Sequence, residues 1–359
     1  MAYSSITKPE LHFNTITYTG DGTSPKARTG VGFKPDWVWS KTLSEIRSHQ
    51  LIDSARGVNK TLTIDNGNAE VTDSNHGYLQ TFDSDGFTSI AGGSGHNNWN
   101  KNSETYVAWN WKANGGTGAS NSDGSISSTV YANTTAGFSM VKYTGTGSVA
   151  TVGHGLGAAP NLIIFKNRTD SGHSYDTYHH KIGTAYRFYF NDYVAKQSAT
   201  NFINDTAPTS SVFTVGVAGH TNGSGDDQIA YCFVEKRGYS KFGEYKGNGN
   251  NNGSFVFTGF KPALIIFKRS NSTGNYTIVD NRRGGINPAN QAGNVIYANE
   301  NYAASTSATQ SVDLLSNGFK IRGSGTNINT SAGQYVYIAF AENPLVANVG
   351  PNGIPATAG

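Results

Sequence analysis

The apolar residues of this chain lie in short runs that are separated by polar, glycine-rich turns. Residues 162–165 and 264–267 form continuous apolar runs of the length expected for strands that are buried on both faces. Asp-Gly before Phe87 and Asn-Gly before Phe319 each predict a turn followed by a strand. Since no long segment has the 3.6-residue periodicity of a helix, the pattern predicts an all-β protein with antiparallel strands.

One set of landmarks occurs three times along the chain. A Tyr-x-Gly-x-Gly segment begins at Tyr18, at Tyr143 and at Tyr245. A proline follows each tyrosine, and a lysine follows each proline, at the same distance in all three copies. These prolines and lysines are Pro35, Pro160, Pro262, Lys41, Lys166 and Lys268. Each copy then ends in an aromatic segment, and we infer from the conserved spacing that one unit is repeated.

Several short strands within each copy predict one antiparallel β-sandwich per repeat, with a jelly-roll or lectin-like topology. The predicted divisions, in chain order, are an N-terminal docking segment at 1–12, sandwich repeat 1 at 13–113, a Gly/Ser-rich linker at 114–137, repeat 2 at 138–238, repeat 3 at 239–343 and an extended C-terminal tail at 344–359. Residues 125–131 of the linker can add an edge strand. We expect both ends to become ordered by docking on a neighbouring chain.

Composition narrows the classes of partner. Charged residues make up 14% of the chain, and 27 basic residues against 24 acidic ones give a net charge of +3. This small excess is spread along the chain, so we predict neither a nucleic-acid partner nor insertion into a membrane. Cys232 is the single cysteine, which excludes an internal disulfide, and its apolar surroundings predict a buried thiol. Because no secretory signal opens the chain, we expect it to be made in a cytosol.

Several motifs of the first repeat occur together in one known family. They are Tyr-Thr-Gly-x-Gly at 18–22, Gly-Phe-x-Pro-Asp-x-Val-Trp at 32–39, Asp-Ser-x-Arg-Gly at 53–57, Ser-Asp-Gly-Phe at 84–87 and Tyr-Val-Ala-Trp-x-Trp-Lys at 106–112. With its two ends, the chain resembles a tandem domain of marine tailed bacteriophages over essentially its whole length. The resemblance implies a virion structural or tail-fibre-like protein with a concanavalin-like lectin sandwich. Repeat 2 departs from the family, because Asp176 is not followed by the arginine turn.

The residues give little support for catalysis. The carboxylate pairs Asp83/Asp85 and Asp226/Asp227 lie in turn-like sequence, where solvated acids are expected. The histidines at 173, 179 and 180 are placed on both faces of a strand by alternation, which does not suit one metal ion. The turns that begin at Asp53 and at Asp280 are expected to carry local ion pairs with Arg56 and Arg282. We therefore predict no catalytic residue, no metal site and no cofactor.

Sugar binding is the serious functional alternative to a purely structural role. Trp99 lies in a polar loop between amide side chains, and a tryptophan in such a loop can stack on a sugar ring while the amides bind its hydroxyl groups. The predicted ligand-binding residues are Asn97, Asn98, Trp99 and Asn100. The competing interpretation is that Trp99 packs over its own loop or against another subunit.

These observations lead to one functional hypothesis with two alternatives. The hypothesis is a non-enzymatic bacteriophage virion protein, made in the host cytoplasm, that serves as a tail-fibre or tail-associated subunit in assembly and host attachment. Its expected partners are other virion proteins, copies of itself in a homotrimer and a host-surface glycan. The first alternative is a capsid decoration protein. The second alternative is a carbohydrate-binding or polysaccharide-degrading module.

Overall fold

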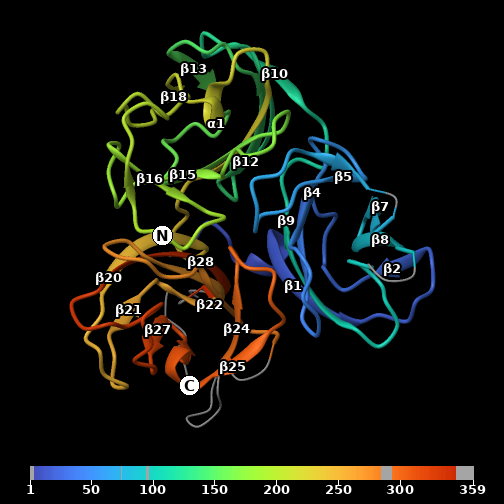
Figure 1. Cartoon of the computed structure of the whole chain (residues 1–359), viewed down its shortest axis with the longest axis vertical. Helices are drawn as coiled ribbons and strands as arrows, with labels where there is room; N and C mark the ends of the chain where they lie inside the picture. Colours follow the sequence, from blue (N-terminus) through green and yellow to red (C-terminus); the bar gives the residue numbers. More distant parts are fainter. Residues whose placement is uncertain (1–3, 74, 94–96, 284–292, 345–359) are drawn as a thin grey trace, which may run out of the picture.

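The computed structural model describes residues 4–73, 75–93, 97–283 and 293–344, and antiparallel β-strands dominate it (Figure 1). In this part of the chain the helices are short: η1 (Pro9–Leu11), α1 (Gly219–Asn222) and η2 (Ala308–Gln310). The prediction of an all-β protein is confirmed. No helix in the described ranges is long and apolar enough to cross a membrane.

Three main sheets share one strand order. In repeat 1 the order is β1 (Phe13–Thr19), β9 (Thr105–Trp111), β3 (Trp37–Thr42) and β4 (Gln50–Asp53). In repeat 2 the matching strands are β12 (Phe138–Thr144), β19 (Asp227–Phe233), β14 (Leu162–Asn167) and β15 (Asp176–His179), followed by β16 (Tyr186–Tyr189) and β17 (Gln197–Ser198). In repeat 3 they are β20 (Ser240–Lys246), β28 (Gln334–Pro344), β22 (Phe260–Arg269) and β23 (Thr277–Asp280), followed by β24 (Gly293–Tyr297) and β25 (Ser305–Ser307). The sequence repeat is thus also a repeat of strand pairing.

A smaller sheet accompanies each main sheet. In repeat 1 it contains β2 (Lys26–Arg28), β8 (Gly86–Ala91) and β7 (Gly77–Asp83), and the hairpin of β5 (Lys60–Thr61) and β6 (Val71–Thr72) lies apart from it. In repeat 2 it contains β13 (Ala150–Gly153) and β18 (Val212–Val215). In repeat 3 it contains β21 (Phe255–Phe257), β27 (Gly318–Ile321) and β26 (Val312–Leu315).

Side chains from the two faces of each main sheet enter different hydrophobic clusters. On β14, Leu162 and Ile164 belong to one cluster, and Ile163 and Phe165 to another, because successive side chains of a strand point to opposite faces. The first cluster contains residues of all three repeats and is called the shared core here. It includes Trp37, Trp111, Phe138, Tyr231, Phe233, Leu264 and Phe340. This packing explains why the apolar runs of the central strands are continuous.

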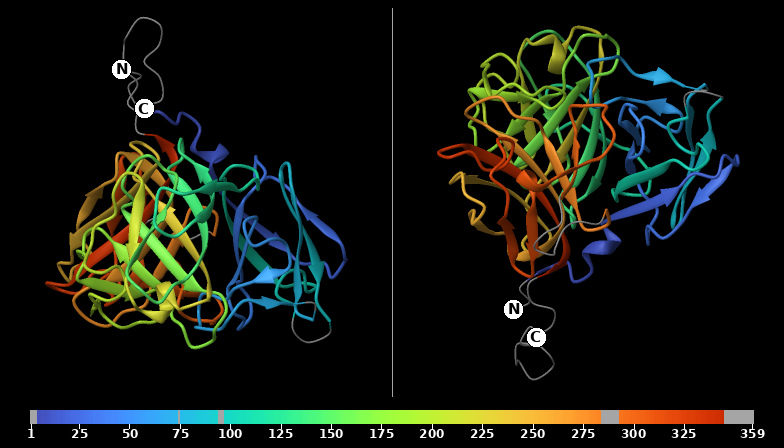
Figure 2. Two further views of the ribbon diagram at one scale, coloured as in Figure 1. Left: turned by 90° about the horizontal axis from the view of Figure 1, so that it is seen from above. Right: turned by 60° about the horizontal axis from the view of Figure 1, so that its bottom comes forward.

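Three outer clusters lie on the opposite faces of the main sheets. Each joins a main sheet to the small sheet of the same repeat. Val38 packs with Phe87 in repeat 1, Cys232 lies in one cluster with Phe213 in repeat 2, and Phe267 packs with Phe319 in repeat 3. The burial predicted for Cys232 is confirmed, and burial raises the pKa of its thiol. The views in Figures 1 and 2 show three lobes, one for each repeat, around the shared core.

The three lobes are joined in a closed ring of equivalent contacts. The buried Lys166 of repeat 2 donates to the Gly67 carbonyl of repeat 1 over 3.1 Å, and Lys268 of repeat 3 donates to the Tyr193 carbonyl of repeat 2 over 2.9 Å. Lys41 of repeat 1 donates to the Asn301 carbonyl of repeat 3 over 3.3 Å, which closes the ring. Burial lowers the pKa of Lys41 and Lys166 to about 8 and that of Lys268 to about 7.

Backbone hydrogen bonds repeat the same cycle two residues after each lysine. The amide of Glu70 donates to the carbonyl of Arg168 over 2.9 Å, and the amide of Lys196 donates to Ser270 over 3.2 Å. The amide of Ala304 donates to Leu43 over 2.7 Å. The lysine that marks each repeat in the sequence therefore marks a contact with the next lobe.

Two predicted segments have a different role from the one expected. The linker at 114–137 contains β10 (Ala119–Asn121) and β11 (Ser128–Asn133), and β11 pairs with β12, so the segment is part of the second lobe. A strand is present where residues 125–131 were expected to add one, but β10 lies at the edge of the sheet and β11 pairs on both sides, so the segment is more than a linker. Of the N-terminal docking segment, the described residues 4–12 pack on their own chain, with Ile6 buried in the shared core. Residues 1–3 and the tail from 345 onward lie outside the described residues.

The predicted arginine turns are present with one correction. Asp53 pairs with Arg56 over 2.5 Å, as expected, but the partner of Asp280 is Arg283, at 2.6 Å, and not Arg282. The side chain three residues on reaches back to the carboxylate, whereas Arg282 donates only its backbone amide to Asp280. The equivalent acid of repeat 2, Asp176, binds Arg187 of β16 over 2.6 Å.

Candidate ligand-binding pocket

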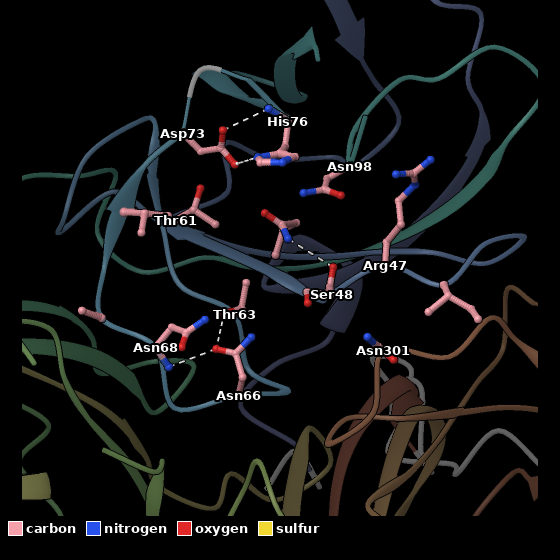
Figure 3. Close-up of a pocket in the computed structure, with 14 residues that line it drawn as sticks. Arg47, Ser48, Thr61, Thr63, Asn66, Asn68, Asp73, His76, Asn98 and Asn301 are labelled. Atoms are coloured by element: carbon pink, nitrogen blue, oxygen red, sulfur yellow. Dashed lines mark hydrogen bonds and ion pairs between the residues drawn. The ribbon is translucent and has the colours of Figure 1, made fainter. Parts of the chain in front are cut away.

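A surface pocket of about 350 Å³ lies where repeat 1 meets repeat 3 (Figure 3). Its wall comes from the loop before β4, from the β5–β6 hairpin and its flanks, from Asn98, and from Asn301 across the boundary between the lobes. The lining residues are Ile46, Arg47, Ser48, Gln50, Thr61, Thr63, Asn66, Asn68, Ala69, Val71, Asp73, His76, Asn98 and Asn301. Repeat 1 thus supplies thirteen of these residues, and repeat 3 adds Asn301 at the boundary.

Neutral amide and hydroxyl groups dominate this pocket. Asn66 accepts hydrogen bonds from the Thr63 hydroxyl at 2.6 Å and from the Asn68 amide at 3.0 Å. Both bonds use the oxygen of Asn66, and Figure 3 shows its NH2 group directed into the open space between the labelled residues. Amide side chains can donate and accept at the same time, which is what a polyhydroxylated ligand requires.

The charged residues of the pocket are held by partners. Arg47 donates to Glu104 through Nη2 at 2.8 Å and through Nε at 3.2 Å. Burial opposes ionisation of Glu104, but the hydrogen bonds from Arg47 and Lys101 outweigh it, and the pKa of Glu104 lies below its ordinary value. Asp73 binds Nδ1 of His76 at 2.7 Å. These pairs leave the neutral groups to determine what the pocket binds.

Hydrophobic contact is limited to the rim. Ile46 is 65% exposed and Val71 is 47% exposed. No phenylalanine, tyrosine or tryptophan is among the described residues that line the pocket, and the imidazole of His76 is its one aromatic ring. The pocket can thus bind a polar ligand by hydrogen bonds, with two aliphatic side chains beside it, but it offers no large aromatic side chain for stacking.

The predicted sugar-binding loop is only partly present at this pocket. Trp99 is fully buried and packs in the outer cluster of repeat 1, with its ring 5.9 Å from that of Phe87. The prediction that Trp99 stacks on a ligand is therefore wrong, because neither face of its ring is open. The competing interpretation, that it packs over its own loop, is the one that the structure supports.

The amide residues beside Trp99 have separate positions. Asn97 is buried and accepts the backbone amides of Trp99 and Asn100 through its side chain. Asn100 is buried and binds the turn at Asp21. Both amides therefore serve the local fold, which corrects their assignment to a ligand. Asn98 is the one residue of the four that lines the pocket. The other asparagines of the pocket come from segments that the sequence analysis did not relate to Asn98.

The other candidate groups are engaged in structural contacts. His179 is buried with its Nε2 atom 3.4 Å from the Tyr337 carbonyl, and His180 lies 2.6 Å from the Phe242 carbonyl, so both belong to the boundary between repeats 2 and 3. Asp85 accepts the amides of Gly30 and Gly32 in its turn. Among the described residues, no group of three or more metal-ligating side chains is close enough to hold a metal ion.

Comparison with known proteins gives a family without an assigned role. Neither a curated protein nor a solved structure matches the chain. A family model described as a domain of unknown function, DUF7483, matches residues 8–344. The matched range covers all three repeats, and all three also contribute residues to the shared core. The chain belongs to the DUF7483 family.

Proposed function

We propose that this protein is a structural component of a tailed-bacteriophage virion, and that it acts as a tail-fibre or tail-associated subunit in assembly and host-surface contact. The observation that carries the proposal is the closed ring of three like lobes around one aromatic core. Such an arrangement gives a rigid body with several similar faces, which suits contact with neighbouring subunits. The resemblance of the sequence motifs to phage proteins supports the same assignment.

The proposal includes three tandem antiparallel β-sandwich domains. The support is that each main sheet faces a small sheet of its own repeat across a separate outer cluster. The lobes are also tied together by the shared core, so we propose that the three domains fold and act as one body. A lectin-like topology is part of this proposal.

Host contact is proposed to use the pocket at the boundary of repeats 1 and 3. Its neutral amide and hydroxyl groups match the hydroxyl groups of a surface glycan better than they match a phosphate or a carboxylate. The proposed contact is binding without chemical conversion. Release of reducing ends from host polysaccharide by the purified protein would contradict it and favour the polysaccharide-degrading alternative.

The decisive experiment locates the chain in purified virus particles. Antibody labelling of the native particle, read by electron microscopy, is expected to place the protein at the tail, and quantitative mass spectrometry is expected to find a fixed number of copies. Absence from purified particles would overturn the virion assignment altogether. A trimer in solution or on the tail would support the expected homotrimer, while a single copy at each attachment point would contradict it.

A capsid decoration protein is the second candidate. The observation that favours it is that one chain already places three equivalent sheets in a ring, which matches the local threefold positions of a capsid lattice. Labelling on the head with a copy number that follows the number of such positions would support this candidate. The same measurement thus separates the two.

A further inference from the structure

The second and third lobes differ in how the outer edge of the small sheet is covered. The strands β13 and β21 are equivalent, because Val152 of β13 pairs with Phe213 and Val256 of β21 pairs with Phe319, the repeated aromatic position. In repeat 2 a segment of the same chain lies along the free edge of β13. In the part of the chain that the structure describes, β21 has one strand neighbour, β27.

The covering of β13 uses specific hydrogen bonds. The amide of Ile126 donates to the Thr151 carbonyl at 2.9 Å, and the hydroxyl of Ser125 accepts the Thr151 amide at 2.9 Å. The hydroxyl of Ser128 donates to the Gly153 carbonyl at 2.9 Å. Ile126 also forms a parallel bridge with Val152. The segment at 125–128 thus covers this edge with one backbone amide and two serine hydroxyl groups.

The equivalent edge of repeat 3 has its backbone groups directed outward. Ser254 and Thr258 bond toward β27 and the turn before it, so the alternation of an antiparallel strand directs the backbone groups of Phe255 and Phe257 to the other side. Their rings are each 47% exposed. Only a few residues separate β19 from β20, so repeat 3 has no insertion comparable with the one that covers repeat 2.

One position shows that the two edges are built for different neighbours. At Gly153 a Cβ atom would meet the Asn121 side chain of the covering segment at 1.7 Å, so the covered edge requires glycine there. The equivalent residue of repeat 3 is Phe257, whose ring is half-exposed. The covered edge thus has no side chain at this position, whereas the uncovered edge has an aromatic ring there.

The surroundings of the exposed rings are basic. Lys320 lies directly opposite Phe255 in the strand register, and the Lys241 ammonium group lies 5.8 Å from the centre of the Phe257 ring. A strand that approaches this edge therefore meets two phenyl rings flanked by two positive charges. An acidic residue on the incoming segment would be favoured by these lysines.

We propose that the β21 edge of repeat 3 is a docking site for an extended segment of a partner protein. The segment carries an acidic residue before a hydroxyl–aliphatic–hydroxyl run, which is the chemistry of residues 123–128 of this chain, and it adds to the small sheet as a new edge strand. Its aliphatic and acidic side chains contact the phenyl rings and the lysines. This inference does not depend on where the protein is located.

The test uses a synthetic peptide with the sequence of residues 123–128, labelled with a fluorophore, and the full-length protein. The peptide leaves out Asn121, because Phe257 stands where Gly153 makes room for that side chain. Saturable binding by fluorescence anisotropy is expected, together with slower hydrogen exchange of the Phe255 and Phe257 amides. The double variant Phe255→Ser/Phe257→Ser is expected to bind at least tenfold more weakly. Phe257→Pro, which removes one outward amide, is expected to do the same. The matched control Tyr302→Ser changes an exposed aromatic residue elsewhere on repeat 3 and leaves binding unchanged.

Several outcomes would overturn the proposal. They are the absence of saturable binding, equal affinity for the double variant, and equal affinity for a peptide that carries Ile126→Asp. A concentration-dependent dimer that the Phe255→Ser/Phe257→Ser variant abolishes would assign the edge to a second copy of the chain instead. Thermal unfolding of each variant, followed by circular dichroism, separates a lost contact from a misfolded protein.

Discussion

The shared core and the three outer clusters are built from opposite faces of the same strands, yet they have different consequences. In the shared core, Trp37 of repeat 1 lies 4.6 Å from the ring of Tyr231 of repeat 2, so a single side chain contacts two lobes. In the outer cluster of repeat 3, Phe319 packs on Phe267 and Tyr337 of the same repeat. The inner faces therefore join the lobes, whereas the outer faces complete each lobe by itself.

The largest effect is expected from Trp37→Ala. Loss of this buried ring should lower the free energy of unfolding by about 3–5 kcal/mol and weaken the contact between two lobes. Hydrogen exchange should accelerate in the main sheets of both repeats 1 and 2. Phe319→Ala is the matched variant in an outer cluster, and its increase in exchange should be confined to repeat 3. Equal patterns for the two variants would show that the inner and outer faces do not differ.

Removal of one buried hydroxyl tests a polar bond across the shared core. The Tyr231 hydroxyl donates to Asp53 of repeat 1 over 2.7 Å. Tyr231→Phe should lower the free energy of unfolding by about 1.5–3 kcal/mol, because the acceptor is charged. The control is Tyr175→Phe, since the Tyr175 hydroxyl is buried without a hydrogen-bond partner among the described residues. Denaturant titration should show little loss for the control, and similar losses for both variants would contradict the assigned role.

The next largest loss of stability is expected from the lysines that contact a neighbouring lobe. Lys166→Met keeps a long apolar side chain but leaves the carbonyls of Gly67 and His173 without this donor. The expected cost is about 1–3 kcal/mol in urea unfolding. Lys181→Met changes an exposed lysine of the same repeat and should have almost no effect. An unchanged free energy of unfolding in Lys166→Met would mean that the ring of contacts does not stabilise the joined lobes.

Acidification should weaken the boundary between repeats 2 and 3. Burial lowers the pKa of His179 from 6.5 to about 3, so below pH 6.5 the unfolded chain binds a proton that the folded chain does not. His179 therefore costs stability as the pH falls, by about 1.4 kcal/mol per pH unit. His179→Asn removes this loss, and the gap in unfolding free energy between wild type and variant should change from pH 7 to pH 5. A gap that is independent of pH would refute the assignment.

The smallest change in stability is expected at the pocket. Asn66→Ala removes an amide from a surface loop, and the free energy of unfolding should change by no more than about 0.5 kcal/mol. Binding of the labelled protein to host cells should nevertheless fall, because the amide is proposed to contact a glycan. Asn248→Ala, an exposed asparagine on repeat 3, serves as the control. Unchanged binding in Asn66→Ala would remove the pocket from host contact.

The repeat and the all-β class could be predicted because they depend on local pattern. Apolar runs, glycine turns and equal spacings are present in the sequence itself. Residues 162–165 were also recognisable as a buried strand, and Lys166 as a repeated landmark. The partner of Lys166 could not be predicted, because its acceptor, the Gly67 carbonyl, lies in another lobe and 99 residues away.

The candidate site was harder to predict for a related reason. The sequence placed Trp99 in a polar loop, but its ring turns inward because the outer cluster of repeat 1 has room for it beside Phe87 and Leu79. The pocket combines Asn66, Asn98 and Asn301, which no spacing relates. The lining residues come from separate loops of repeat 1 and, at Asn301, from repeat 3, so the pocket depends on how these segments pack together, for which their linear order holds no signal.

The covalent connection of the three lobes has a consequence for how the ring persists. In a trimer of separate subunits, dilution favours dissociation, but here each lobe is tethered to the next and its effective local concentration stays high. Mutation can also alter one lobe without altering its siblings. The Trp109 indole of repeat 1 donates a hydrogen bond to Asp280, and the Tyr231 hydroxyl of repeat 2 donates one to Asp53. Ile338 has the same position in the strand register of repeat 3, and its side chain has no group that can donate. A tethered ring thus keeps its form at any dilution while its faces diverge.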